Sequence, residues 1–584
     1  MQQFQFEYKN LEQLRKELEK IRQWCKVKVT SNILFLIYSE STDDKQIEKI
    51  CGTIKEELPS AQYAGCSSNG NIASGHIANA PITIVCSVFE YISTKVEVLQ
   101  YELSDESAND VAARLIRFVD MNPWVKAVQL LVTIRGMSMT NFCEALYPLR
   151  GGVQIFGGGA FNPDINNDTA CVFSSAGKCD SHSVAFILYG GNDFNVMSMH
   201  ITGWKPLGRW FKVTKARGGI LYELDGRPAY EAYYKYLNIQ NNEHFFRNTL
   251  EFPFLFQLHG IDILRAPIAS NPDGSLTMTS DMAENVIAKI AYGDPHTILD
   301  RVRRDCQAVR QFQPEIIQVF SCAGRRTFWG QSEISKETLP FQTIAPTSGF
   351  YTSSEFLRTD GHVNQHNVTL VIAAMREGGV SESEAIAFEM QDESFSGKVS
   401  MINRLATFIE AATSELREAN EKLALAAVTD GLTGLYNRAE IQKRIVAKCA
   451  EQDCKFSLVM IDIDNFKFVN DTYGHAEGDN VIIGLSNRIK DVVRELAPAA
   501  SAGRWGGEEF MILLPNFSEE SAEFFAEKLR KSFAYSTFPS VGQGTISLGV
   551  TVFRPGESSD SVCIRVDNAL YSAKRGGKNR VVAL

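Results

Sequence analysis

The chain has 584 residues, a formal net charge of −10 and 44% hydrophobic residues, which predicts several soluble globular domains. Its acidic balance argues against a nucleic-acid partner, and its apolar runs are too short to cross a membrane. Twelve cysteines without CxxC pairs favour reduced thiols over a disulfide framework or a zinc site, and without an apparent signal peptide we expect a cytoplasmic location.

The first two-thirds of the chain predict a helix followed by a sheet-rich region. Residues 11–24 alternate charged and apolar positions at helical spacing. From about residue 29 to 375, short apolar runs are punctuated by Gly, Asn and Asp, which indicates sheet-rich α+β structure. The polar, acidic stretch at 376–395 marks a boundary.

A heptad seam follows this boundary and predicts a helix over 395–428. Apolar positions recur at alternating three- and four-residue steps, at Ile402, Leu405, Ile409, Ala412, Leu416, Ala419, Leu423 and Ala426. An amphipathic helix packed on its own domain would show such a seam, and so would a parallel coiled coil of two copies. The position between two domains favours the coiled coil, and the alanines would make it weak.

Residues 429–584 alternate strands and helices, which predicts a ferredoxin-like, palm-type domain with a mainly antiparallel sheet. We expect strands over 456–463 and 544–553, helices over 476–496, 518–534 and 564–574, and a hairpin around 506–510. Gly506 and Gly507 suit a two-residue turn with positive φ, followed by a returning strand from Phe510 to Leu514.

The paired acids Glu508 and Glu509 at this turn require a positive partner. Asp462 ends the strand expected at 456–463 and would meet Glu508 if that strand lies beside the hairpin. Two carboxylates ~4 Å apart repel by about 4 kcal/mol at an effective dielectric constant near 20, so either one is protonated or a cation lies between them. An all-oxygen site suits Mg²⁺ or Mn²⁺, and Mg²⁺ keeps positions for substrate phosphates.

The segment after Asp462 offers nucleotide contacts. Asn465, Phe466 and Lys467 open a helical turn whose backbone amides and ammonium could hold phosphate. Asn470 and Asp479 offer an amide and a carboxylate that match the edge of guanine and reject adenine. Each residue alone would also serve as a helix cap or turn residue.

The block 429–584 resembles the GGDEF family of diguanylate cyclases along its length. The matching segments are TDGLTGLYNR (429–438), DIDNFKFVNDTYGHAEGD (462–479), RWGGEEF (504–510), SLGV (547–550) and DNALYSAKRGGKN (567–579). The resemblance implies condensation of two GTP molecules into cyclic di-GMP and pyrophosphate across a homodimer interface. The alternatives are a catalytically silent domain that binds a nucleotide or a partner, and a cyclase with altered base preference.

The same resemblance implies a role for each site residue. Glu508 and Glu509 would be the catalytic acids, with Glu508 taking the proton of the ribose 3′-hydroxyl. Two Mg²⁺ or Mn²⁺ ions per GTP would be held by Asp462, the Ile463 carbonyl and Glu508. Phosphate contacts are implied for Lys467, Arg504, Lys574 and Lys578, the last standing where arginine is usual. His475 would lie near the ribose or serve as a turn residue.

One feature of many family members is missing. They carry an RxxD site for their own product just before the hairpin, and the corresponding positions here are Ala497 and Ala500. Inhibition by product through that route is therefore expected to be absent.

Residues 24–375 resemble FIST sensory domains, with an N-terminal part over 24–220 and a C-terminal part over 221–375. The similar segments include AGCSSNGNI (64–72), FGGGAFN (156–162), HITGWKPLG (200–208), LDGRPAYEAY (224–233) and FSCAGRRTFWG (320–330). The resemblance implies a small-molecule ligand, with amino acids as candidates, that would change the packing of the coiled coil.

Five residues are candidates for contacting that ligand, namely Cys66, Ser67, Arg325, Tyr351 and Glu355. The loop with Cys66 and Ser67 could instead hydrogen-bond to itself. Arg325, Tyr351 and Glu355 could clamp a zwitterion together with Arg326, or form surface pairs.

Overall fold

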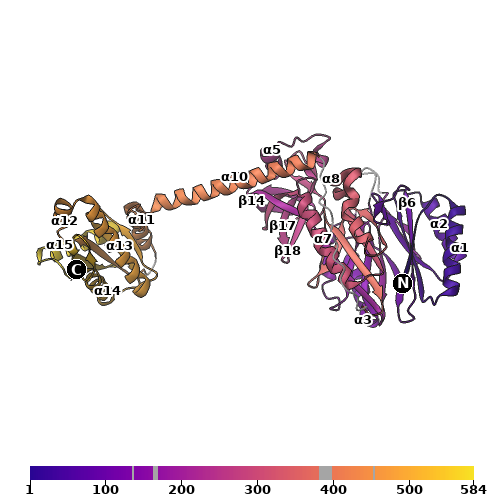
Figure 1. Ribbon diagram of the computed structural model, residues 1–584, viewed down its shortest axis with the longest axis horizontal. Helices are drawn as coiled ribbons and strands as arrows, with labels where there is room; N and C mark the ends of the chain where they lie inside the picture. The colour runs from indigo at the N-terminus through magenta and orange to yellow at the C-terminus, as the bar shows by residue number, and fades with distance from the viewer. Residues whose placement is uncertain (135–136, 162–168, 381–396, 452–453) are drawn as a thin grey trace. The chain divides into compact units, whose positions relative to one another are not determined.

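The computed structural model describes residues 1–134, 137–161, 169–380, 397–451 and 454–584 (Figure 1). The chain divides into two compact units, Met1–Ala411 and Ala412–Leu584. Their boundary lies within helix α10 (Gly397–Val428). Across the described ranges, we find no helix whose length and apolar character would carry it through a bilayer.

The first sheet of the first unit is covered by the two N-terminal helices. Its strand order is β1 (Gln2–Glu7), β6 (Ile82–Phe89), β2 (Asn32–Ser39), β3 (Gln62–Ser67), β10 (Val172–Ser174) and β11 (Gly177–Asp180). Helices α1 (Leu11–Val27) and α2 (Asp44–Glu57) share one apolar core with β2 and β6. The helix predicted from residue 11 is confirmed.

Two further sheets join segments from both halves of this unit. One runs β25 (His362–His366), β24 (Glu355–Thr359), β9 (Gln154–Gly159), β8 (Val125–Val132), β12 (Ser183–Gly190) and β7 (Lys95–Glu102). The other runs β13 (Phe194–Ile201), β26 (Leu370–Glu377), β22 (Ile316–Cys322), β23 (Thr347–Thr352), β4 (Asn71–Ala73) and β5 (His76–Ile77). Because β24 pairs with β9 and β23 with β4, the halves are interleaved strand by strand.

A fourth sheet lies between these segments in the sequence. Its order is β18 (Ile261–Arg265), β17 (Phe254–Leu258), β21 (Ile287–Gly293), β14 (Trp204–Arg217), β15 (Ile220–Leu224), β20 (Leu276–Met278) and β19 (Pro267–Ser270), with β16 (Arg227–Pro228) beside β15. The remaining helices of the first unit are α3 (Ala108–Met121), α4 (Met139–Ala145), α5 (Tyr230–Leu237), α6 (Phe245–Thr249), α7 (Pro295–Phe312), α8 (Ala323–Glu333), η1 (Ile334–Glu337) and α9 (Leu339–Gln342). The sheet-rich α+β expectation is confirmed.

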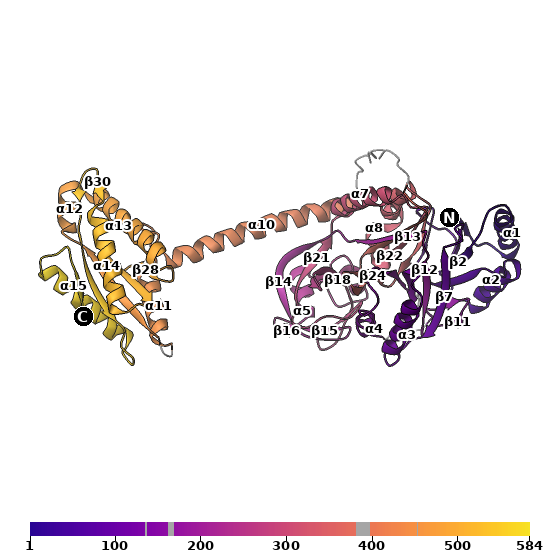
Figure 2. The same cartoon turned by 90° about the horizontal axis from the view of Figure 1, so that it is seen from below.

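The second unit is a five-stranded sheet between two helical layers. The strand order is β28 (Ser501–Arg504), β29 (Glu509–Pro515), β27 (Phe456–Ile463), β32 (Ile546–Val552) and β33 (Val581–Ala583), with only β32 and β33 parallel. Helices α13 (His475–Leu496) and α14 (Glu519–Ala534) pack on one face, and α11 (Arg438–Cys449) and α15 (Ser559–Arg575) on the other (Figure 2). The remaining elements are α12 (Phe466–Tyr473), β30 (Thr537–Phe538) and β31 (Gly542–Gln543).

The elements predicted here are present, with differences at their ends. Strand β27 covers the predicted 456–463, and all its residues are buried. Helix α15 begins at Ser559, earlier than predicted, because the side chain of Ser558 accepts a hydrogen bond from the Ser561 backbone and caps the helix.

The turn before β29 differs from the prediction. Neither Gly506 nor Gly507 adopts positive φ, so a two-residue primed turn is wrong. The last strand pair is Arg504 with Phe510, which leaves a wider loop. The reason is the Arg504 side chain, which donates hydrogen bonds to the carbonyls of Gly506 (3.2 Å) and Gly507 (2.7 Å) and holds the loop open.

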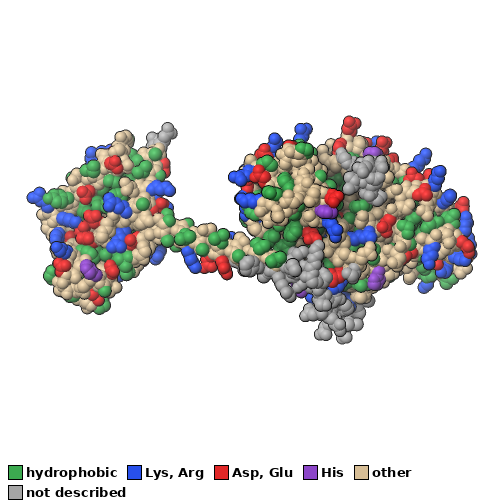
Figure 3. Space-filling view, turned by 90° about the horizontal axis from the view of Figure 1, so that it is seen from above, with side chains coloured by type: hydrophobic (Ala, Val, Ile, Leu, Met, Phe, Trp, Pro, Cys, Tyr) green, Lys and Arg blue, Asp and Glu red, His purple; other side chains and the backbone are tan. Residues whose placement is uncertain are grey.

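Helix α10 contains the heptad seam. Four of its apolar side chains are exposed in the chain, with exposed fractions of 55% for Leu405, 42% for Ile409, 63% for Leu416 and 67% for Leu423. Figure 3 shows hydrophobic side chains at the surface along this helix. The helix is therefore not simply an amphipathic helix buried on its own domain, and the coiled coil stays a prediction. Residues 395–396 and the Ile402 side chain lie outside the described part.

Candidate active site

The central strand of the second unit delivers Asp462 to the edge of the acidic turn. Six apolar or small residues anchor β27 before it, and Asp462 itself is only 6% exposed. In the strand register, Asp462 lies opposite Glu509 on β29 and Ser547 on β32. The predicted pairing of this strand with the GGEEF hairpin is thus confirmed.

Lys574 provides the positive charge at this carboxylate. It lies in the last turn of α15, and its Nζ is 2.6 Å from Oδ2 of Asp462. Burial raises the pKa of Asp462 to about 6, Lys574 opposes this shift, and the charges of Glu508 and Glu509 add to it. Three acidic groups therefore act on one another with a single ammonium bound among them.

The donors here suit a hard divalent cation. Asp462 and Glu508 offer carboxylates and Ile463 a carbonyl, all oxygen ligands of the kind that Mg²⁺ and Mn²⁺ prefer. Burial is the main cause of the raised pKa of Asp462, and the charges of Glu508 and Glu509 add repulsion to it. A further cation would relieve that repulsion, so the residues fit the expected metal.

Asp464, two residues on, is committed to structure. Its carboxylate accepts hydrogen bonds from Ser547 Oγ (2.6 Å), Thr545 Oγ1 (2.8 Å) and the Asn579 backbone (3.0 Å). These bonds tie the loop after α15 to the end of β27. Asp464 therefore positions that loop and is not free to ligate a metal together with Asp462.

The loop tied by Asp464 brings two predicted phosphate contacts together. Lys578 Nζ donates to Asn465 Oδ1 at 2.6 Å. Both residues have positive φ, 56° for Asn465 and 61° for Lys578, so each lies in a tight bend. Lys467 is exposed beside them, whereas the Phe466 side chain is buried in the core and leaves only its backbone amide for a ligand.

The predicted guanine contacts flank the turn between α12 and α13. Asn470 lies on α12, and His475 and Asp479 are exposed in the first turns of α13. The Asn470 side-chain oxygen Oδ1 occupies the space that a Cβ at Gly478 would need, so a larger residue there would displace the Asn470 side chain.

Arg504 has a partner that the sequence did not reveal. Its Nη1 lies 3.3 Å from Oδ2 of Asp430, besides its bonds to the turn carbonyls. Burial opposes the shift, but hydrogen bonds from Thr433 and the charge of Arg504 lower the pKa of Asp430. The three-residue spacing of Asp430 and Thr433, typical of a side chain that caps backbone amides, indicated a structural role for Asp430 but not its pairing with Arg504. The phosphate role of Arg504 stays a prediction.

Ala497 and Ala500 face inward. Ala497 is 3% exposed in the main apolar core, and Ala500 packs against the same core. The positions of the family's product site therefore present methyl groups to the protein interior.

All five sensor candidates are buried. Cys66 and Ser67 end β3; Ser67 Oγ donates to the Phe161 carbonyl (2.8 Å) and accepts from the Cys171 amide (3.0 Å). Cys66 is fully buried, and burial raises the pKa of its thiol. This favours a loop that hydrogen-bonds to itself over a nucleophile.

Arg325 is a buried ion pair and not a surface one. It is 0% exposed, its Nε lies 3.0 Å from Oε2 of Glu337, and it donates to the Val368 carbonyl at 3.0 Å. Surface pairing is therefore wrong for Arg325, and Glu337 is a partner that the sequence analysis missed. A guanidinium already bound in this way is not available to clamp a zwitterion.

Tyr351 and Glu355 are also buried. The Arg326 guanidinium lies 5.8 Å from the centre of the Tyr351 ring. Glu355 accepts a hydrogen bond from the Thr369 amide at 3.3 Å, and burial raises the pKa of its carboxyl group. A surface cavity of about 320 Å³ lies elsewhere in this unit, with Arg209, Arg227, Glu231 and Lys235 among its lining residues.

Three family models match the chain. They are the FIST N domain over residues 33–227, the FIST C domain over 229–358, and "Diguanylate cyclase, GGDEF domain" over 427–580. Both resemblances inferred from the sequence are confirmed.

Curated relatives match the C-terminal part. Diguanylate cyclase DgcM of Escherichia coli (strain K12) is 38% identical over 175 residues, 29% of this chain and 42% of that protein. Diguanylate cyclase VdcA of Vibrio cholerae is 38% identical over 191 residues, 31% of this chain and 55% of that protein. The chain thus covers less than two thirds of the length of either relative.

Solved structures are similar over the same part. The coiled coil and GGDEF domain of DgcB from Caulobacter crescentus, in complex with c-di-GMP, is 36% identical, with 32% of this chain and all of that chain covered and a TM-score of 0.30. The active GGEEF domain of a diguanylate cyclase from Vibrio cholerae is 35% identical, with 25% and 96% covered and a TM-score of 0.24.

Proposed function

We propose that this chain, which joins FIST N and FIST C domains to a GGDEF domain, is a diguanylate cyclase that converts two GTP molecules into cyclic di-GMP and pyrophosphate. The observation that carries the proposal is the buried Asp462 carboxylate, at the end of the central strand, opposed by Glu508 and Glu509 and bound by Lys574.

The acidic residues would perform the proton transfer. Asp462, Glu508 and the Ile463 carbonyl would hold Mg²⁺ or Mn²⁺, which when bound stabilises charge on the triphosphate and makes the 3′-hydroxyl more acidic. Glu508 accepts the 3′-hydroxyl proton, the 3′-oxygen bonds to the α-phosphorus of the other GTP, and pyrophosphate leaves with the bonding electron pair. Glu509, opposite Asp462, would add negative charge to the site.

The basic residues would bind phosphates, and one side-chain amide and one carboxylate would select the base. Lys574 exchanges Asp462 for a phosphate oxygen when GTP enters, while Lys467 lies in the first turn of α12 and Lys578 in the loop after α15. Asn470 and Asp479 would accept and donate hydrogen bonds along guanine.

Two copies of the chain are required, because each half-site holds one GTP and the attack crosses between them. The exposed apolar side chains of α10 support a parallel dimer through this helix. A ligand of the FIST domains would then regulate the enzyme by changing the packing of α10.

The second candidate is a catalytically silent GGDEF domain. The deciding experiment incubates the full chain with GTP and Mg²⁺ or Mn²⁺ and separates the products by chromatography, with Glu508→Gln as the matched control. Cyclic di-GMP from the wild type alone supports the cyclase. A dimeric protein that binds GTP but forms no product with either metal would instead establish the silent domain.

A further inference from the structure

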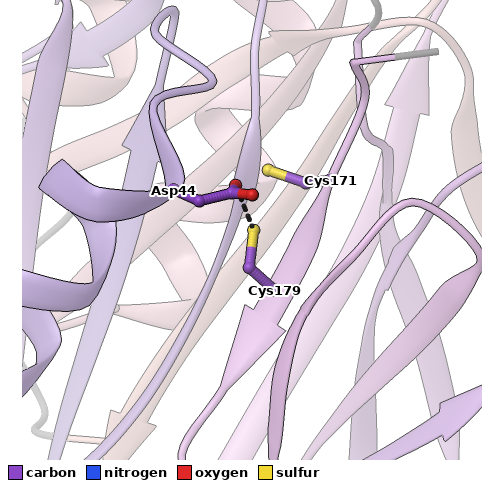
Figure 4. Close-up of side chains that lie close together, drawn as sticks. All are labelled: Asp44, Cys171 and Cys179. Atoms are coloured by element: carbon purple, nitrogen blue, oxygen red, sulfur yellow. Dashed lines mark hydrogen bonds between the residues drawn. The ribbon is translucent and has the colours of Figure 1, made fainter.

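Three side chains from distant parts of the sequence meet at the edge of the first sheet. Asp44 begins α2, Cys171 precedes β10, and Cys179 lies on β11 (Figure 4). One ligand atom from each lies within 4.8 Å of the other two, and the Cys179 thiol donates to Asp44 Oδ1 at 3.3 Å. Within the described ranges, this is the group of three His, Cys, Asp or Glu side chains that meets this distance.

The fold holds these groups in place before any ligand arrives. In the β10–β11 hairpin Val172 pairs with Asp180, so Cys171 and Cys179 project from the face opposite to that pair, toward α2. The backbone of Cys171 is bonded at both its amide (3.0 Å) and its carbonyl (2.9 Å) to Ser67 on β3. Two of the three ligands therefore lie on a hairpin that hydrogen bonds to β3 hold in place.

The three donor atoms are close enough for one cation to contact all of them, since each lies within 4.8 Å of the other two. A bound cation would stabilise both thiolates and the carboxylate at once.

We propose that Asp44, Cys171 and Cys179 bind one Zn²⁺ ion. Two thiolates and one carboxylate are a ligand set that favours Zn²⁺ over Mg²⁺. Binding forms two Zn–S bonds and one Zn–O bond and releases the two thiol protons to solvent. Cys171 is buried, Cys179 half-buried and Asp44 exposed, so the ion enters from the Asp44 side and its fourth position faces water.

The ion would join α2 to the β10–β11 hairpin and, through Ser67, to the end of β3. It would therefore be a site of the sensor unit, separate from the proposed GTP site. The inference does not depend on the proposed cyclase activity, because its test measures metal binding.

The test uses the full chain, reduced and stripped of metal, titrated with Co²⁺ as a spectroscopic probe and with Zn²⁺ against a chromophoric chelator. The wild type should show thiolate-to-cobalt charge-transfer absorption. Cys179→Ser should lose one molar equivalent of Zn²⁺, and Asp44→Asn should weaken binding at this site at least ~10-fold. Asp44 is exposed, so Asp44→Asn is expected to fold normally.

Cys25→Ser is the matched control, since Cys25 is another half-buried cysteine of the same unit. It should bind Zn²⁺ as the wild type does. Equal stoichiometry and affinity in the wild type, Cys179→Ser and Asp44→Asn would overturn the proposal. So would an equal loss in Cys25→Ser, or a Cys171–Cys179 disulfide in the reduced preparation with no metal bound.

Discussion

The Nζ of Lys574 lies 2.6 Å from Oδ2 of Asp462, so the last turn of α15 supplies the positive charge for the buried carboxylate at the end of β27. The two residues are far apart in the sequence and come from adjacent layers of the fold. Glu508 and Glu509 have no ion-pair partner of this kind among the described residues, and the first predictions concern this imbalance.

The fragment 395–584 should convert GTP to cyclic di-GMP by itself, because the acidic turn, the phosphate loops and α10 all lie within it. The measurement is chromatography of the products formed with Mg²⁺ and with Mn²⁺. A folded, dimeric fragment that forms no product with either ion would contradict the expectation.

Glu508→Gln should lower turnover at least ~10²-fold, because an amide cannot accept the 3′-hydroxyl proton and binds metal weakly. The fold should survive, since the change removes one of several mutually repelling charges. Initial rates at saturating GTP test this, with the exposed Glu523→Gln on α14 as control. A rate near that of the wild type would show that Glu508 is not the base.

The raised pKa of Asp462 predicts that this carboxyl group makes the second unit less stable above about pH 6 than in acid. Its folded pKa of about 6 exceeds the ordinary 3.8, so its favourable contribution is complete below the ordinary value and is lost as pH rises through about 6. A shift of roughly two units corresponds to at most about 3 kcal/mol.

Urea denaturation of the second unit at about pH 4 and about pH 8 measures this difference. Asp462→Asn should reduce it, whereas the exposed Asp491→Asn should leave it unchanged. Mg²⁺ should restore stability at the higher pH in the wild type and not in Asp462→Asn. An identical pH dependence in the wild type and Asp462→Asn would contradict the assignment.

Cyclic di-GMP should not inhibit through the surface before the hairpin. Ala497 and Ala500 present methyl groups to the core and offer a guanine neither charge nor hydrogen bonds. Rates measured over a range of product concentrations at several GTP concentrations test this. Non-competitive inhibition by micromolar product would reveal another binding surface.

The heptad register of α10 should determine how ligand binding in the first unit changes the activity of the second. Ala412→Leu with Ala419→Leu should tighten the dimer and make activity less dependent on the first unit, because each missing methylene costs roughly 0.8 kcal/mol of burial. Deleting seven residues keeps the heptad phase, whereas deleting four rotates one unit against the helix. Equal activity in the two deletions at equal dimer fraction would rule out transmission by phase.

Local patterns predicted the elements of the second unit well. Strand 456–463 is a mostly apolar run with four apolar residues in succession at its centre, and a run of that kind has few alternatives to a buried strand. The width of the acidic turn was not predictable in the same way. It depends on Arg504 reaching the carbonyls of Gly506 and Gly507, which is a side-chain choice and not a propensity.

Contacts between distant residues account for the other differences. The buried pair of Arg325 with Glu337 could not be told from a surface pair, because charge alone does not indicate burial. Asp44, Cys171 and Cys179 lack any metal-ligand spacing in the sequence, and the sheet alone brings them together. The scattered cysteines therefore gave no indication of a site.

The interleaved sheets of the first unit limit how this protein can be divided and recombined. β4, β5 and β13 share a sheet with β22, β23 and β26 from the second half of the unit, and β24 and β25 complete a sheet of the first half. A chimaera that exchanged only residues 24–220 would have to match foreign strand edges at both places. Sensor exchange between proteins of this architecture should therefore move the whole of residues 1–380 as one cassette, with the cut placed before α10.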